Sequence, residues 1–269
     1  MRVIVFSKLL KPYTPEQLLA FAKAQKIDGF DLAVRDGYPV NPENIEQALV
    51  PFAKQAKAVG LSVPLVTLGG LALDPKAKST EAAWAACGQA GVEAVKLGYW
   101  LWKPGEHYWT KVKEIRAQLA DYAVLAKKYG VKAVFHTHSD PYYGINASAL
   151  MHLLDGLDPN HVAAYLDPAH LGLDGEPLDM ALDMLRGRLG MVAVKNSHVT
   201  KTPNGWMRGF CRLPDGLVDW TKALRQIKAS GFTGALSVHG EYDHRDSMEE
   251  ALDFLIPDLA WLRQTLATI

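Results

Sequence analysis

The segment that decides the fold is Val-Ala-Ala-Tyr-Leu-Asp-Pro-Ala-His, residues 162–170, a short apolar run that ends in polar residues. Asp167 stands directly before Pro168, a pair that is typical of a turn. The pattern recurs along the chain, because short apolar runs alternate with longer segments of helical periodicity. Strands that alternate with helices in this way predict parallel strand–helix–strand units.

Eight such runs follow one another along the chain, each with a helical segment after it. Eight units in about 250 residues predict a closed β/α barrel, and we expect residues 1–269 to form this single domain. The alternative is an open doubly wound sheet, but the first strand-to-helix turn lacks the Gly-x-Gly-x-x-Gly motif that would favour it. A polar loop is expected after the seventh strand. The predicted strands are residues 3–7, 29–35, 62–68, 94–100, 132–138, 162–166, 191–195 and 235–238, and the predicted helices are residues 15–22, 41–60, 79–91, 107–129, 146–154, 178–186, 218–229 and 247–266.

Composition narrows the class of protein. The 29 basic and 29 acidic residues give a net charge of zero, whereas a nucleic-acid-binding protein usually carries a basic surplus. No apolar run approaches the roughly 18 residues of a membrane-spanning helix, so we expect no membrane partner. Cys87 and Cys211 show neither a Cys-x-x-Cys motif nor the density of a disulfide framework, which favours a reduced, cytoplasmic setting.

Polar residues stand at the carboxyl ends of most of the predicted strands, where barrels of this type have their active sites. Side chains alternate faces along a strand, so His136 shares a face with His138, and His239 shares one with Glu241. A buried polar group costs about 1–3 kcal/mol unless it is paired, so the joint placement indicates a site and not packing. The residues are Lys8, Arg35, Lys96, His136, His138, Asp167, His170, Lys195, His198, His239 and Glu241, and Trp206 lies in the loop expected over the mouth.

Two chemistries suit these residues, and the residues alone leave both open. In the first, His, Asp and Glu from different strands hold a divalent metal ion (Mn²⁺, Zn²⁺, Co²⁺ or Mg²⁺) that polarises a carbonyl. In the second, Lys195 or His170 moves a proton without a metal. The cations Lys8, Arg35, Lys96 and Lys195 indicate a small-molecule substrate with a carboxylate, a phosphate or an enolate-like intermediate.

Several segments, taken in order, resemble the sugar phosphate isomerase/epimerase superfamily of xylose isomerase-like barrels, which also contains inosose dehydratases, hydroxypyruvate isomerases and AP endonucleases. The resemblance covers nearly the whole chain. Its most specific part is the Asp-Pro-x-His element at residues 167–170. The segments are residues 30–35, 134–138, 165–170 and 234–241, together with residues 213–220, which resemble the stretch before the family's last helix.

The resemblance implies a divalent metal held by a Glu on the fifth strand, an Asp on the sixth, a His on the seventh and a Glu on the eighth. Asp167 matches the sixth-strand ligand, and His170 matches the histidine that meets metal or substrate. The chain departs from this ligand pattern at the fifth, seventh and eighth strands. There His136, Ala193 and His239 stand where the family has Glu, His and Glu. Either the metal site is re-registered, or the metal is lost and Lys195 acts with the histidines. The re-registered ligands would be His138, Asp167, His198 and Glu241.

The resemblance also implies an isomerase, epimerase or dehydratase that abstracts a proton next to the carbonyl of a sugar or cyclitol, and the cations favour an acidic one. Glu241, His170 and Lys195 are the expected catalytic groups. A homo-oligomer is compatible with the family. A non-catalytic sugar-binding barrel is an alternative of a different class, and zero net charge disfavours an AP endonuclease. The expected substrate-binding residues are Lys8, Arg35, Lys96, His136, His239 and Trp206.

Overall fold

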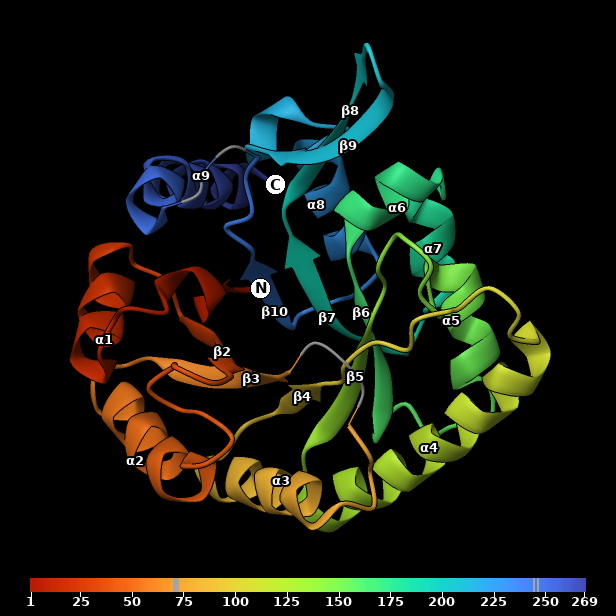
Figure 1. Ribbon diagram of the computed structural model, residues 1–269. Helices are drawn as coiled ribbons and strands as arrows, with labels where there is room; N and C mark the ends of the chain where they lie inside the picture. Colours follow the sequence, from red (N-terminus) through yellow and green to blue (C-terminus); the bar gives the residue numbers. More distant parts are fainter. Residues whose placement is uncertain (70–72, 244, 246) are drawn as a thin grey trace.

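The computed structural model describes residues 1–69, 73–243, 245 and 247–269. A closed barrel of eight parallel strands forms its centre, and helices surround the barrel (Figure 1). The predicted β/α barrel is therefore confirmed. In order around the barrel, the strands are β1 (Arg2–Phe6), β10 (Ala235–Val238), β7 (Leu189–Val194), β6 (Val162–Leu166), β5 (Lys132–His136), β4 (Ala94–Lys96), β3 (Ser62–Leu68) and β2 (Gly29–Val34).

The helices lie outside the strands, as parallel strand–helix units require (Figure 1). None of the described helices has the length and apolarity to cross a bilayer. They are α1 (Pro15–Ala24), α2 (Ile45–Ala58), α3 (Lys78–Ala90), α4 (Tyr108–Tyr129), α5 (Ala147–Leu154), α6 (Pro168–Asp174), α7 (Leu178–Met184), α8 (Trp220–Ala229) and α9 (Met248–Thr268), with 3-10 turns at η1 (Ser7–Leu10) and η2 (Leu213–Asp215).

Helices α1 and α9 each begin at a capping box, a pair of residues whose side chains accept from each other's backbone N–H groups. The Thr14 hydroxyl accepts from the backbone N–H of Gln17, and the Gln17 side chain accepts from the backbone N–H of Thr14. Ser247 and Glu250 form the same reciprocal pair at α9. Each box satisfies backbone donors that the first helical turn leaves free, which fixes where the helix starts.

The core has two parts, one inside the barrel and one between strands and helices. Large aliphatic and aromatic side chains fill the outer part, where the helices pack on the strands. The inner part uses many small residues, since inward side chains from all strands meet in a narrow space. Its members are Ile4, Leu65, Ala94, Val134, Ala163, Tyr165, Met191, Ala193 and Ala235.

Gly29 opens β2 at a point where only glycine fits. Its φ angle is +153°, a region that L side chains rarely adopt. A Cβ atom there would collide with the carbonyl oxygen of Ser62 on β3. The close approach sets the pairing of β2 with β3, and β2 then carries Asp31 into the barrel.

The largest departure from the predicted elements follows β7. Residues expected as a polar loop form an antiparallel hairpin of β8 (Asn196–Thr202) and β9 (Gly205–Cys211), paired from Asn196 with Cys211 to Thr202 with Gly205. Half of the residues in these two strands are exposed, and the hairpin lacks the apolar alternation of a half-buried strand. Helix α6 was also not predicted, and it begins directly at Pro168. The fourth and fifth strands end at Lys96 and His136, earlier than predicted.

Candidate functional site

Four of the predicted residues meet in the mouth of the barrel, at the carboxyl ends of separate strands. His136 ends β5, and Asp167, Lys195 and His239 directly follow β6, β7 and β10. All four side chains are buried. The His136 Nε2 atom lies 3.1 Å from Asp167 Oδ2, and Lys195 Nζ lies 3.4 Å from the same oxygen. The structure therefore brings these polar groups together, as the strand-end pattern indicated.

Asp167 is held by the start of helix α6. Its Oδ1 atom accepts from the backbone N–H groups of Ala169 and His170, at 3.0 and 3.3 Å, so the side chain is the N-cap of that helix. Its Oδ2 atom is left to face the mouth. Burial would raise the pKa of Asp167, but Lys195 and the neighbouring histidines hold it well below its usual value. Asp167 is therefore a fixed negative charge.

Lys195 lies between two carboxylates. Its Nζ atom is 2.8 Å from Glu241 Oε2 and 3.4 Å from Asp167 Oδ2, and it stands 4.4 Å from the centre of the Phe210 ring. Burial would lower the pKa of Lys195, but the two carboxylates raise it above its usual value. Lys8 reaches the other oxygen of Glu241 at 3.2 Å from the solvent side. Lys195 is thus a permanent positive charge in the mouth.

Two histidines in the mouth form hydrogen bonds with tyrosine hydroxyls. The Tyr99 hydroxyl lies 2.5 Å from His136 Nδ1, and the Tyr165 hydroxyl lies 2.8 Å from His239 Nε2. Burial lowers the pKa of His239 to about 3 and that of His136 well below its usual value. Both imidazoles are therefore neutral near pH 7, and their orientation is fixed by hydrogen bonds.

His170 presents an open ring nitrogen. Its Nδ1 atom lies 2.7 Å from the Ser139 hydroxyl, while its buried Nε2 atom has no hydrogen-bond partner among the described residues. Nε2 is 3.6 Å from Asp167 Oδ2. The His138 ring packs on that of His170, with centroids 3.9 Å apart. Burial lowers the pKa of His170 to about 3, so His170 is a neutral imidazole whose buried Nε2 atom is unpaired within the described residues.

A second polar layer surrounds Asp31 on β2. The Asp31 carboxylate accepts from Thr67, Ser237 and Tyr165, at 2.6, 3.0 and 3.4 Å. Burial raises the pKa of Asp31 to about 6. Lys96 is buried at the end of β4, with Nζ 4.2 Å from the centre of the Tyr99 ring, and burial lowers its pKa to about 7. Both groups titrate near neutrality.

Two residues of the hairpin, His198 and Trp206, lie outside this cluster, contrary to the prediction. The His198 imidazole lies 3.0 Å from Asp243 and 2.9 Å from the Thr200 hydroxyl. Trp206 is 71% exposed near the tip of the hairpin, which extends outward at the top of Figure 1. The hairpin instead reaches the mouth through Phe210, whose ring contacts Lys195 and lies 5.8 Å from that of His170.

The structure adds residues that the sequence reasoning did not select. Tyr165 is two positions before Asp167, so strand alternation already places both on one face. Asp31 and Tyr99 lie within the predicted strands 29–35 and 94–100 but are not among the residues selected for the site. Ser139 carries no sequence signal, because only the folded loop after β5 brings its hydroxyl to His170.

The implied divalent metal does not fit these residues as the structure arranges them. In the described part of the chain, no three His, Cys, Asp or Glu side chains are grouped as a metal site. The carboxylates of Asp167 and Glu241 already bind Lys195, and His138 Nδ1 lies 2.6 Å from the Ser139 carbonyl oxygen. Since His198 pairs with Asp243, the four predicted ligands do not form one donor set.

Comparison with protein families gives one match over most of the chain. Residues 19–263 match the family described as xylose isomerase-like TIM barrel. The search of curated proteins finds no match to this sequence.

Comparison with solved structures finds the same barrel in several proteins. A 3-keto-D-glucoside 4-epimerase from E. coli has a TM-score of 0.77 and 16% identity, over 98% of this chain and 99% of that one. A probable 3-DHS dehydratase from Bacillus anthracis gives 0.74 and 13%, over 98% and 99%. A D-allulose 3-epimerase from Methylomonas sp., in complex with D-allulose, gives 0.71 and 14%, over 100% and 96%. At these identities the likeness establishes the fold alone.

Proposed function

Because the chain belongs to the xylose isomerase-like TIM barrel family, we propose that it is an isomerase, epimerase or dehydratase of a small sugar- or cyclitol-like molecule. The reaction removes a proton from the carbon next to a carbonyl group. Support comes from the solved relatives, which are named as epimerases of a 3-keto-D-glucoside and of D-allulose and as a probable dehydratase. The polar mouth, with neutral imidazoles beside fixed charges, suits this chemistry.

The observation that carries the proposal is the Lys195 ammonium between Asp167 and Glu241. Removal of a proton next to a carbonyl places negative charge on the carbonyl oxygen. An oxygen that accepts a hydrogen bond from Lys195 Nζ meets a positive charge that is already in place, so little reorganisation is needed as charge develops. Lys195 thereby supplies the electrophilic stabilisation that the reaction needs, and the proposal includes no metal.

Glu241 is the proposed base. Its side chain is 26% exposed, so a substrate in the mouth can reach the carboxylate. Burial favours a higher pKa for Glu241, yet Lys195 and its other cationic neighbours hold the pKa well below the usual value. A substrate oxygen that takes hydrogen bonds from Lys195 weakens this pairing. The pKa of Glu241 then rises, and the carboxylate becomes a stronger base when substrate is bound.

His170 is the proposed second proton donor, because its neutral ring carries a proton on Nε2 when Nδ1 accepts from the Ser139 hydroxyl. Its open Nε2 atom lies in the mouth beside Asp167, and the Ser139 hydroxyl orients the ring from the other nitrogen. A proton delivered from this position to the opposite face of the same carbon gives an epimer, and a proton delivered to the former carbonyl carbon gives an isomer. The same proton delivered to a leaving hydroxyl group gives a dehydration product.

Solvent exchange tests this function. The metal-free protein is incubated in D₂O with ketoses and keto-glycosides, and proton NMR follows the signal of the hydrogen next to the carbonyl. Glu241→Gln is expected to slow exchange by about 10³-fold, because a positioned general base usually accelerates a proton transfer by about this factor. Lys195→Met is expected to slow it by about 10²–10³-fold, as loss of electrophilic stabilisation does elsewhere.

Lys128→Met is the matched control, since Lys128 on α4 binds the Glu81 carboxylate on α3 in an exposed ion pair outside the mouth. This variant is expected to keep exchange within about fivefold, as exposed ion pairs contribute little. Binding of these sugars without exchange in any of them would contradict the proposal and favour a non-catalytic sugar-binding barrel.

A further inference from the structure

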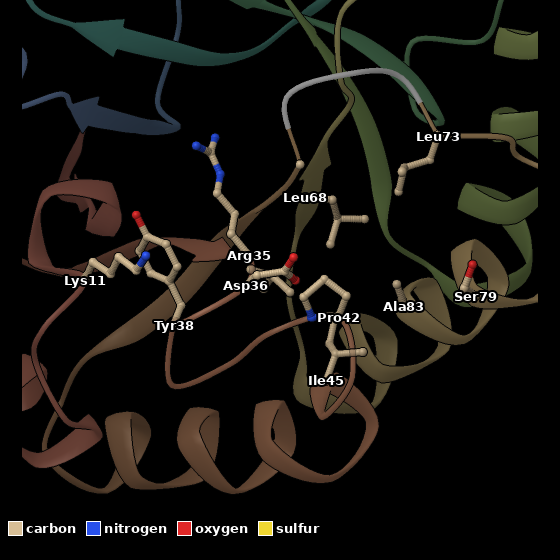
Figure 2. A pocket seen from close by; sticks show the side chains of 12 residues that line it. Lys11, Arg35, Asp36, Tyr38, Pro42, Ile45, Leu68, Leu73, Ser79 and Ala83 are labelled. Atoms are coloured by element: carbon tan, nitrogen blue, oxygen red, sulfur yellow. The ribbon is translucent and has the colours of Figure 1, made fainter.

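A cavity of about 600 Å³ opens at the carboxyl ends of β2 and β3 (Figure 2). Its walls come from the last residues of these strands, the loops that follow them, helices α2 and α3, and the segment after η1. The volume lies within the range of pockets that hold small organic ligands. Most of the wall is apolar, and the apolar residues are Val34, Pro42, Ile45, Leu68, Leu73 and Ala83.

Cations outnumber carboxylates in the described lining of this cavity. Lys11 and Arg35 contribute two positive charges, against one carboxylate from Asp36. Figure 2 shows Lys11 and Tyr38 on the side of the cavity opposite Ala83. An anionic group at the cationic side, with an apolar group against the remaining walls, therefore matches the lining.

Arg35 links the cavity to the mouth. It directly follows β2 and lines the cavity, and Figure 2 shows its side chain leading away from Pro42 and Ile45. Its guanidinium carbon is 5.6 Å from the centre of the Phe6 ring, which in turn lies 4.9 Å from that of His239 in the mouth. The Arg35 Nε atom is buried and has no hydrogen-bond partner within the described residues.

We propose that this cavity is a second substrate subsite, which takes an aryl or branched alkyl substituent of a substrate whose anionic group binds Arg35 and whose carbonyl lies in the mouth. The subsite rests on the proposed function for the identity of the reacting end. A free sugar has no apolar part to cover these walls, whereas an aryl or alkyl conjugate removes them from water. The unpaired Nε of Arg35 offers a donor for a carboxylate or phosphate.

Three small probes separate the parts of this ligand. They are 3-phenylpropanoate, which has both an aryl and an anionic group, propanoate, which lacks the ring, and 3-phenylpropanol, which lacks the charge. Their dissociation constants are measured by NMR titration of the intact chain. We expect 3-phenylpropanoate to bind at least about tenfold tighter than either of the others, since burial of a ring adds to the contact with Arg35.

Two tryptophan variants on the same helix locate the binding. Ser79 lines the cavity from an exposed position on α3, whereas Gln89 is exposed on α3 and does not line it. Ser79→Trp is expected to remove the advantage of 3-phenylpropanoate over propanoate, and Gln89→Trp is expected to keep it. Arg35→Met is expected to remove the advantage of 3-phenylpropanoate over 3-phenylpropanol.

Equal binding of 3-phenylpropanoate and propanoate would overturn the subsite, and so would equal affinities of the Ser79→Trp and Gln89→Trp variants. Neither assay involves turnover. A failure here therefore leaves the proposed proton transfer standing, and a failure of solvent exchange leaves the measured subsite standing.

Discussion

Two buried lysines in the same mouth have pKa values shifted in opposite directions, and their partners explain why. Lys195 lies within 3.4 Å of two carboxylates, and its pKa is raised. Lys96 lies over an aromatic ring, and burial lowers its pKa to about 7. Ion pairing thus decides the charge of a buried lysine here, because burial alone disfavours the charged form of both.

The same contrast separates two groups of residues. We call Asp167, Lys195 and Glu241 the charged trio, and Asp31 with Lys96 the inner pair. The trio keeps its charges through short ion pairs. Burial brings both pKa values of the inner pair near neutrality, and the hydroxyl groups that donate to Asp31 offset only part of its shift. Fixed charges suit electrostatic stabilisation, whereas groups that titrate near neutrality suit proton storage.

The largest effect on stability is expected in the charged trio. Lys195→Met leaves Asp167 and Glu241 without the cation between them, and we expect a loss of about 4 kcal/mol in the free energy of unfolding at pH 7. Urea denaturation measures the change. Lys8→Met is the control, with a loss of about 0.5 kcal/mol or less, because Lys8 is half exposed. Equal losses in both variants would break the distinction between buried and exposed partners.

The inner pair predicts opposite dependences on pH. The pKa of Asp31 rises from 3.8 to about 6 on folding, so the folded state binds the extra proton and stability falls as pH rises through this window. The pKa of Lys96 falls from 10.5 to about 7, so the unfolded state binds the extra proton and stability rises between these values.

Asp31→Asn tests the acidic window. We expect it to remove a fall of about 3 kcal/mol in the free energy of unfolding between pH 4 and 6, as two pKa units correspond to about that energy. Unfolding curves recorded at a series of pH values give the result. Lys96→Met is expected to flatten the alkaline rise instead. A variant of either residue with the wild-type pH profile would show that these two groups do not titrate as a buried pair.

The smallest effect separates the two aromatic residues of the hairpin. Phe210 packs beside Lys195 and His170, so Phe210→Ala is expected to cost about 1 kcal/mol in the free energy of unfolding and to raise the KM of the proposed reaction. Trp206→Ala is expected to stay within about 0.5 kcal/mol with KM unchanged, since Trp206 is mostly exposed. A larger effect at Trp206 would return that residue to the substrate-binding set.

The barrel and the polar residues near the carboxyl ends of its strands could be predicted because periodicity and strand alternation are local in sequence. His136, Asp167, Lys195 and His239 follow directly from that pattern. The pairing within the charged trio could not be predicted, since it depends on how β6, β7 and β10 close around the barrel. The same residue types therefore suggested a metal site, whereas the folded chain places an ammonium group between the two carboxylates.

The hairpin of β8 and β9 shows a second limit of prediction from sequence. Half of its strand residues are exposed, and they carry little alternation of apolar and polar residues, so the sequence pattern predicts a loop and favours Trp206 over Phe210. Tyr165 could have been predicted, because strand alternation places its side chain on the same face as that of Asp167. Ser139 could not have been predicted, since its contact with His170 joins the loop after β5 to helix α6, 31 residues further along the chain.

The central claim is that Lys195 supplies the positive charge of this mouth in place of a divalent metal. In the most direct test, the protein is dialysed against an equimolar mixture of Mn²⁺, Zn²⁺, Co²⁺ and Mg²⁺, and free metal is then removed. The metal bound per chain is measured by mass spectrometry, and the Asp167→Ala variant is the control. We predict far less than one metal per chain in the wild type and no difference from the variant. One metal per chain that is lost in Asp167→Ala would contradict the account.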